Sequence, residues 1–313
     1  MKYASAALLG LFLASAFTPA NASKGIPGNA DHRFAQLETL LPTAGTTRTA
    51  SGAPGAQYWQ QRADYRIKVT LDEKRHRLIA SQSITYMNRS PDTLSYIWLQ
   101  LDQNIFKDDS IARRSEVAAN SGTRRDSVGK GDSLSFAAMR RHQAFQDRKY
   151  GYDIGQVRDA SGRVLRTTVN DTMMRIDLPQ PLRPGTSIEI RFDWESNIVN
   201  EAAIGARGGY EYFEGSDTYQ YFLAQWFPRL VAYTDYTGWQ HKQFLGRGEF
   251  TLEFGDYDVE LTVPADHIVA STGELQNADA VLTATQRERL KRAATAKSPV
   301  FIVTPEEAKA NEK

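Results

Sequence analysis

Short runs in which apolar and polar side chains alternate recur along most of this chain, and they constrain its fold more than any other feature. Tyr65–Leu71 (YRIKVTL), Thr172–Leu178 (TMMRIDL) and Ser187–Ser196 (SIEIRFDWES) all follow this pattern. Successive side chains of a strand point to opposite faces, so a period of two indicates a strand buried on one side. Counting similar runs yields about a dozen short strands with turn residues between them. We therefore predict an all-β fold, a large antiparallel sandwich or saddle-like domain with a short helical remnant at the C-terminal end.

The segments near the end of the alternating region carry two more specific predictions. Glu249–Phe254 and Tyr257–Val263 are predicted to form a hairpin, because Gly255-Asp256 lies between them and has the composition of a turn. Further on, Ala280–Ala296 is charged and favours a helix, and Pro299–Val303 is predicted to be a strand.

The N-terminus predicts export. Lys2 precedes an apolar stretch that is too short to span a bilayer, and Ala20-Asn21-Ala22 has the small residues of a cleavage site. We expect residues 1–22 to be a secretory signal peptide and the protein to be periplasmic or secreted. No other segment approaches the roughly 20 apolar residues of a membrane helix, so no membrane span is predicted. The chain has no cysteine, which excludes disulfides and thiolate metal sites.

Composition divides the rest of the chain into three parts. Residues 23–60 are rich in Ala, Gly, Thr and Pro and predict a flexible linker. The alternating runs occupy 61–275, with an insertion at 107–150, and 276–313 form a helix–strand remnant. The insertion contains pairs of adjacent arginines, which could form a basic patch for an acidic partner. A solvated insertion is the favoured interpretation, because interspersed acidic residues nearly cancel the charge.

Charge and histidine spacing exclude several classes of function. The net charge is +1 from 38 basic and 37 acidic residues, so nothing steers the chain towards nucleic acid. A thermolysin-like zinc site needs two histidines four residues apart on one helix, with a Glu between them and another downstream. No histidine here has such a partner, so we predict no metal ligand and no catalytic residue in this chain. The five are His32, His76, His142, His241 and His267.

Three segments, taken in order, resemble the N-terminal β-domain of the aminopeptidase N/leukotriene hydrolase-like zinc metallopeptidases. They are Tyr65–Leu71 with the strand after it, Pro181–Ile190 (PLRPGTSIEI), and Tyr219–Leu275. The resemblance implies a divergent, bacterial-type branch in which 61–275 is this β-domain. It also implies that the zinc-binding helix of the family would lie beyond Lys313, in a catalytic domain that this chain lacks. Zinc would belong to the full-length enzyme, and this chain is expected to bind none and to be inactive alone.

The resemblance also assigns two candidate substrate-binding residues. Gln225 matches the family's substrate-contacting glutamine, and the residue two further on, usually Glu or Gln and a ligand of the substrate's free amine, is here Phe227. In an extended segment both side chains would share one face, an amide beside an aromatic wall. The peptide N-terminus is the implied partner. The competing interpretation is that Gln225 satisfies a loop backbone and Phe227 belongs to the core.

Two other functions stay open at this stage. A stand-alone exported β-sandwich could bind peptide or glycan through exposed aromatic side chains. A peptidase homologue without catalysis could act as a scaffold. If the resemblance holds, the isolated chain should expose an apolar patch where the missing catalytic domain would pack, and should tend to associate. The aromatic residues that would suit a binding platform are Tyr210, Tyr212, Phe213, Tyr219, Tyr221, Phe222, Trp226 and Trp239.

Overall fold

The computed structural model of the protein describes residues 44–115, 136–146, 148–246, 248 and 251–310. The predicted signal peptide, most of the predicted linker and the middle of the insertion lie outside these residues. The chain divides into two compact units, Met1–Tyr58 with Tyr233–Trp239, and Trp59–Ala232 with Gln240–Lys313. Within the described part of the chain, no helix is both long and apolar enough to cross a membrane.

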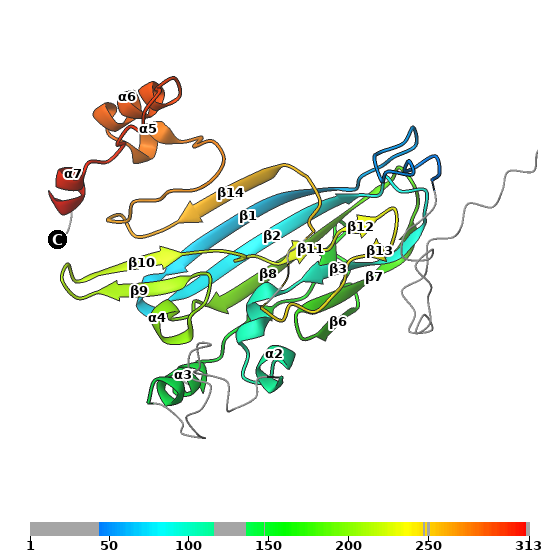
Figure 1. The fold of residues 1–313 in the computed structure, drawn as a ribbon, viewed down its shortest axis with the longest axis horizontal. Coiled ribbons are helices and arrows are strands. Elements are labelled where there is room, and N and C mark those ends of the chain that lie inside the picture. Colours follow the sequence, from blue (N-terminus) through cyan, green and yellow to red (C-terminus); the bar gives the residue numbers. More distant parts are fainter. Residues whose placement is uncertain (1–43, 116–135, 147, 247, 249–250, 311–313) are drawn as a thin grey trace, which may run out of the picture. The chain divides into compact units, whose positions relative to one another are not determined.

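The second unit is built around a six-stranded sheet (Figure 1). Its order is β14-β1-β2-β8-β4, and β5 also pairs with β8. The bounds are β1 Arg62–Asp72, β2 Arg77–Met87, β4 Tyr152–Ile154, β5 Arg158–Asp159, β8 Ser187–Asn197 and β14 Tyr257–Thr262. All pairs are antiparallel except β1 with β14, which run parallel with Tyr65 opposite Tyr257. The predicted all-β fold is confirmed, with this one parallel pair as a departure from a purely antiparallel sheet.

The core of this unit follows from the alternation in the sequence. On β1 the odd-numbered side chains from Ala63 to Leu71 are buried, while Arg66, Lys68 and Thr70 are exposed. The neighbouring strand β2 repeats the pattern, and on β8 the side chain of Trp194 is almost fully buried. One face of the sheet is therefore apolar and the other polar, as the period of two requires.

A second sheet has the order β11-β3-β7-β6, and its strands are β3 Leu94–Gln100, β6 Thr167–Asn170, β7 Met173–Leu182 and β11 Arg229–Leu230. Polar contacts tie it to the buried face of the large sheet. The backbone N–H of Leu230 donates to the Tyr65 hydroxyl at 2.8 Å, and the Gln82 amide donates to the Pro228 carbonyl at 2.8 Å. Trp194 in turn donates to the Gln82 side chain at 3.0 Å. These buried polar groups are thus satisfied across the two sheets.

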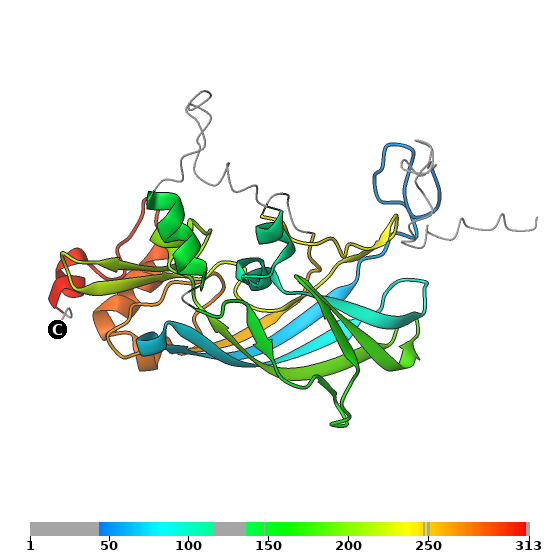
Figure 2. The same cartoon turned by 90° about the horizontal axis from the view of Figure 1, so that it is seen from below.

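The chain also contains smaller elements, and Figure 2 shows the same cartoon turned by 90°. The hairpin β9–β10 comprises Gly209–Phe213 and Thr218–Phe222. Helix α3 (Phe136–Gln146) packs on α4 (Glu201–Ile204), and Phe145 and Ile204 share a buried apolar cluster with Tyr150 and Val199. In the first unit, Arg48 Nε lies 2.6 Å from the Asp235 carboxylate. The remaining bounds are η1 Glu73–Arg75, η2 Asp102–Phe106, α2 Ile111–Arg114, α3 Phe136–Gln146, α4 Glu201–Ile204, β12 Tyr233–Thr234 and β13 Gly238–Trp239.

The predicted hairpin around Gly255-Asp256 is wrong. The backbone carbonyls of Phe254 and Asp256 accept hydrogen bonds from Ala63 and Tyr65, so the chain continues alongside β1 without turning back. A Cβ at Gly255 would clash with the carbonyl oxygen of Ala63. Glycine is therefore required for close approach of two backbones, and not for a turn.

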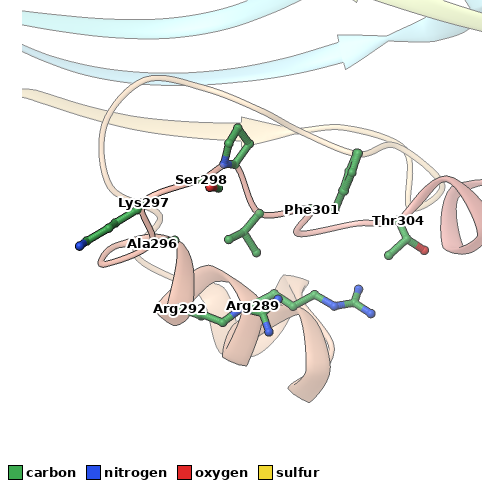
Figure 3. A pocket seen from close by; sticks show the side chains of 9 residues that line it. Arg289, Arg292, Ala296, Lys297, Ser298, Phe301 and Thr304 are labelled. Carbon is green, nitrogen blue, oxygen red and sulfur yellow. The ribbon is translucent and has the colours of Figure 1, made fainter.

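The C-terminal region also differs from the prediction. The predicted helix Ala280–Ala296 is two helices, α5 (Ala278–Val281) and α6 (Ala284–Ala293), because Thr283 begins α6 with a capping box. The predicted strand Pro299–Val303 is irregular and leads into α7 (Pro305–Ala310). This segment and α6 border an open hollow of about 470 Å³, in which Phe301 is largely exposed (Figure 3).

Candidate functional site

The two predicted site residues lie in the loop that joins β10 to β11. This loop consists of bends and not of a strand, and Gln225 has a φ of 53°, in the left-handed region. The expectation that Gln225 and Phe227 share one face of an extended segment is therefore wrong. A left-handed glutamine costs roughly 1–2 kcal/mol relative to ordinary backbone, so surrounding contacts must impose this conformation.

Two side chains hold the backbone of Gln225 in place. The Gln103 amide donates to the carbonyls of Ala224 and Gln225, at 3.2 and 3.0 Å, and the Tyr152 hydroxyl donates to the Gln225 carbonyl at 3.2 Å. Gln103 comes from η2 and Tyr152 from β4. Burial raises the pKa of the Tyr152 phenol well above its usual value, so this hydroxyl stays protonated and remains a donor.

A buried ion pair fixes the end of the loop. Arg229, the first residue of β11, donates from Nε to the Asp102 carboxylate at 2.9 Å, and Gln100 donates to the other carboxylate oxygen at 2.8 Å. Both charged side chains are almost fully buried. Burial raises the pKa of Asp102, and the attraction of Arg229 opposes this effect. Asp102 and Gln103 are both in η2. This one short helix therefore holds the loop at two places, Gln225 and Arg229.

Phe227 is part of an aromatic cluster next to the sheet edge. Its ring meets that of Tyr65 edge-on with centroids 5.7 Å apart, and that of Tyr257 at 6.1 Å. Tyr65 and Tyr257 stack at 4.7 Å with an interplanar angle of 5°. Trp226 contacts both Phe227 and Trp194, at 4.9 and 6.1 Å. Phe227 thus forms a packed aromatic wall and is only partly accessible.

The side chain of Gln225 is left available for a ligand. It is half-buried, and among the described residues its amide makes no hydrogen bond. A cavity of about 20 Å³ lies beside the loop, bordered by Gln103, Ala224 and Trp226, among others. This volume admits about one water molecule, so a peptide would have to bind at the surface of the loop.

The sequence analysis missed the residues whose side chains hold this loop in place. They are Asp102, Gln103, Tyr152 and Arg229. Their only sequence signal is polarity at a position that ends a buried strand, as Asp102 does after Leu94–Leu101. Their partners are more than 70 residues away along the chain, so no local pattern connects them.

A second polar cluster surrounds His76, one of the five histidines for which the sequence predicts no metal-binding role. It is buried, follows η1 with a φ of 48°, and stacks on Tyr210 at 3.9 Å. Its Nδ1 lies 2.7 Å from the Tyr221 hydroxyl. Burial and the nearby Arg148 lower the pKa of His76. On the hairpin, Tyr210 pairs with Tyr221 and Tyr212 with Tyr219, so these four rings share one face.

The other candidate aromatic residues are divided between the two units. Trp226 lies in the loop of the second unit, whereas Trp239 belongs to the first unit, where it meets Tyr233 edge-on at 5.0 Å. The described residues contain no group of three His, Cys, Asp or Glu side chains able to hold a metal ion. The residues that the structure describes therefore do not fit a zinc site.

Comparison with known proteins gives a limited structural likeness. No protein-family model and no curated protein sequence matches the chain. It is similar to a mutant M1 zinc metallopeptidase from Deinococcus radiodurans bound to a Tyr-Ser-Ala substrate (14% identity, TM-score 0.35, 70% of this chain and 36% of that chain). It is also similar to a two-domain M1 zinc metallopeptidase mutant bound to L-tryptophan (14% identity, TM-score 0.35, 75% and 39%). The chain spans little more than a third of those chains.

Proposed function

We propose that this chain is the non-catalytic N-terminal portion of an exported zinc-dependent aminopeptidase, and that it lines the entrance to the peptide-binding site. The observation that carries this proposal is the backbone of Gln225, which is held in a strained conformation by Gln103 and Tyr152 while its side-chain amide stays unengaged. Strained residues that the surrounding structure imposes cluster at ligand-binding sites. The ordered sequence segments that resemble the aminopeptidase N family support the same assignment.

In this proposal Gln225 and Phe227 have separate roles. The amide of Gln225 offers both a donor and an acceptor to the polar N-terminal end of a peptide. Phe227, fixed between Tyr65 and Tyr257, presents an apolar wall beside it. Since Phe227 has no acceptor for an ammonium group, recognition of the amine belongs to the catalytic domain of the whole enzyme. That domain would also hold the zinc ion, which would supply the Lewis-acid chemistry of hydrolysis there.

The test compares this chain with the full reading frame that contains it. Zinc content and hydrolysis of aminoacyl substrates are measured for both proteins. Stoichiometric zinc and hydrolysis in the longer protein alone support the proposal. Zinc and activity in neither protein would contradict it, and tight zinc in the short chain would show that its histidines form a site.

A variant addresses the role of Gln225 itself. In the longer protein, Gln225→Ala removes one hydrogen-bonding group and should raise KM about tenfold with little change in kcat. Gln220→Ala, on the exposed face of β10, serves as the matched control and should leave both constants unchanged. An unchanged KM in Gln225→Ala would exclude the substrate contact.

A second candidate function is supported by the tyrosine face of the β9–β10 hairpin. Tyr212 and Tyr219 are 46% and 41% exposed, and their ring centroids lie 5.0 Å apart. Such a platform suits a stand-alone module that binds peptide or glycan. Binding of oligosaccharides or peptides by this chain, abolished by Tyr212→Ala and Tyr219→Ala, would favour this function. A homologue that serves only as a scaffold would bind neither ligand and no zinc.

A further inference from the structure

Within the part of the chain that the structure describes, the edge strand β14 presents an apolar row that is largely exposed. Tyr257, Val259 and Leu261 are 49%, 39% and 39% exposed. Their register partners on β1, Tyr65, Ile67 and Val69, are at most 5% exposed. Both rows lie on the same, apolar face of the sheet, so the core face of the large sheet continues into solvent along β14. Figure 1 shows β14 as the outermost strand beside β1.

The backbone of β14 is also available along this edge. In a parallel ladder, alternate residues of a strand bond to one neighbour and the residues between them point to the other side. Tyr65 donates to the carbonyl of Asp256, which assigns the even-numbered residues of β14 to β1. The N–H and C=O groups of Tyr257, Val259 and Leu261 therefore point away from β1. Within the described residues, β14 pairs with β1 and with no other strand.

The polar face of β14 indicates what kind of strand fits there. It carries the acidic residues Asp258 and Glu260, both exposed, opposite Arg66 and Lys68 of β1. Lys68 and Glu260 form an ion pair of 2.8 Å. The existing neighbour of β14 thus alternates apolar side chains on one face with basic side chains on the other. A second strand with the same alternation could place its apolar side chains beside the apolar row of β14 and its basic side chains beside Asp258 and Glu260.

Charge argues against a second copy of this chain at the same edge. If two β14 strands paired, Asp258 and Glu260 of one copy would face the same acidic residues of the other. Like charges directly opposite each other on paired strands destabilise the pairing. Acidic residues on an exposed edge are a recognised device against such self-association.

We propose that the free edge of β14 is a docking site for an extended peptide segment in which apolar and basic residues alternate. The segment adds a strand to the sheet, with its amides bonded to the outward groups of Tyr257, Val259 and Leu261. Its apolar side chains continue the core face next to Phe227 and Tyr257, and its basic side chains meet Asp258 and Glu260. This site is separate from the side chain of Gln225.

The test uses labelled peptides and fluorescence anisotropy with the whole chain. The probe has the sequence of Tyr65–Leu71 (YRIKVTL) with blocked ends, and the matched control replaces its Arg and Lys by Glu. The probe should bind saturably, and the acidic control should bind about tenfold or more weakly, since two favourable charge pairs become repulsive. N-methylation of alternate amides on the probe should abolish binding, because it removes the ladder donors.

Protein variants locate the site. Asp258→Lys should weaken binding of the basic probe and strengthen that of the acidic peptide. Asp193→Lys places the same charge change on the polar face of β8, away from the edge, and should leave both affinities unchanged. Equal binding of the two peptides, an equal effect of both variants, or self-association that displaces the probe would overturn the proposal. These measurements need neither zinc nor hydrolysis, so their failure leaves the proposed function to its own test.

Discussion

Arg229 and Asp102 form an ion pair across 127 residues of sequence, with Arg229 Nε 2.9 Å from the Asp102 carboxylate. The pair links β11 to η2, and so it fixes the C-terminal end of the loop that contains Gln225. Its burial means that each charge depends on the other, because neither has access to bulk water.

Removal of one partner of this pair should be strongly destabilising. Arg229→Met leaves the Asp102 carboxylate buried without its cation, and we expect a loss of about 3–5 kcal/mol in the free energy of unfolding. The double variant Asp102→Leu/Arg229→Met removes both charges and should recover most of that loss. Urea denaturation followed by tryptophan fluorescence measures the free energy of unfolding of both variants.

A control variant breaks an exposed ion pair. Arg166→Met removes the partner of Asp177 and should lower the free energy of unfolding by less than about 1 kcal/mol. Equal losses in the two single variants would contradict this account.

The left-handed backbone at Gln225 predicts an unusual order of substitutions. Asn tolerates this conformation, so Gln225→Asn should change the free energy of unfolding by less than about 0.5 kcal/mol. Gln225→Val should destabilise the protein by about 1–2 kcal/mol, because a β-branched residue is strained there. At Gln220, in the middle of β10, the order should reverse, since strands favour Val over Asn. Urea denaturation of the four variants tests this, and the same order at both positions would argue against an imposed left-handed conformation.

His76 should make stability depend on pH. Its pKa in the folded protein is below the ordinary value of about 6.5, so the unfolded chain binds the proton more readily. The stabilisation from the neutral ring is present above pH 6.5 and is lost as the pH falls from there towards the lowered folded-state pKa. Besides Arg148, Asp72 acts on the ring and opposes the shift.

Urea denaturation between pH 5 and pH 8 tests this effect. His76→Gln, which cannot titrate, should show a weaker fall in stability at acidic pH than the unaltered chain. His142→Gln, on the exposed face of α3, serves as the matched replacement of a histidine that lies outside the cluster. An identical profile for His76→Gln would mean that the ring titrates alike in the folded and unfolded states.

The exposed apolar row on β14 should make the isolated chain bind apolar dyes and associate through the apolar face of the sheet, and not by pairing of two β14 edges. Val259→Lys and Leu261→Lys place charges in that row, so both should lower the fluorescence of an environment-sensitive dye and shift sedimentation velocity profiles towards monomer. Val169→Lys, at a half-exposed position of β6, serves as the control and should have a smaller effect. A dye-negative monomer at high concentration, before any substitution, would contradict the predicted apolar patch.

The strands with strong alternation were predictable to within a few residues. Tyr65–Leu71 lies within β1, Thr172–Leu178 begins one residue before β7, and Ser187–Ser196 differs from β8 by one residue. The sequence predicted a helix in the C-terminal region but did not predict that it divides into α5 and α6. The residues around Thr283 are compatible with a helix whether Thr283 caps a new helix or continues one. The role of Gly255 was misinterpreted because glycine permits both a turn and a close backbone approach, and only the position of Ala63 distinguishes them.

For strongly alternating segments such as Tyr65–Leu71 and Ser187–Ser196, the sequence by itself determined where the strand lies and which side chains are buried, because a period of two is a local property of consecutive side chains. The tertiary structure alone decided that β14 runs parallel to β1, that Gln225 is left-handed, and that Asp102 meets Arg229. Each of these depends on hydrogen bonds between residues far apart in the chain. No local pattern encodes such partners, since the same residue types would be equally stable in other local arrangements until the fold brings them together.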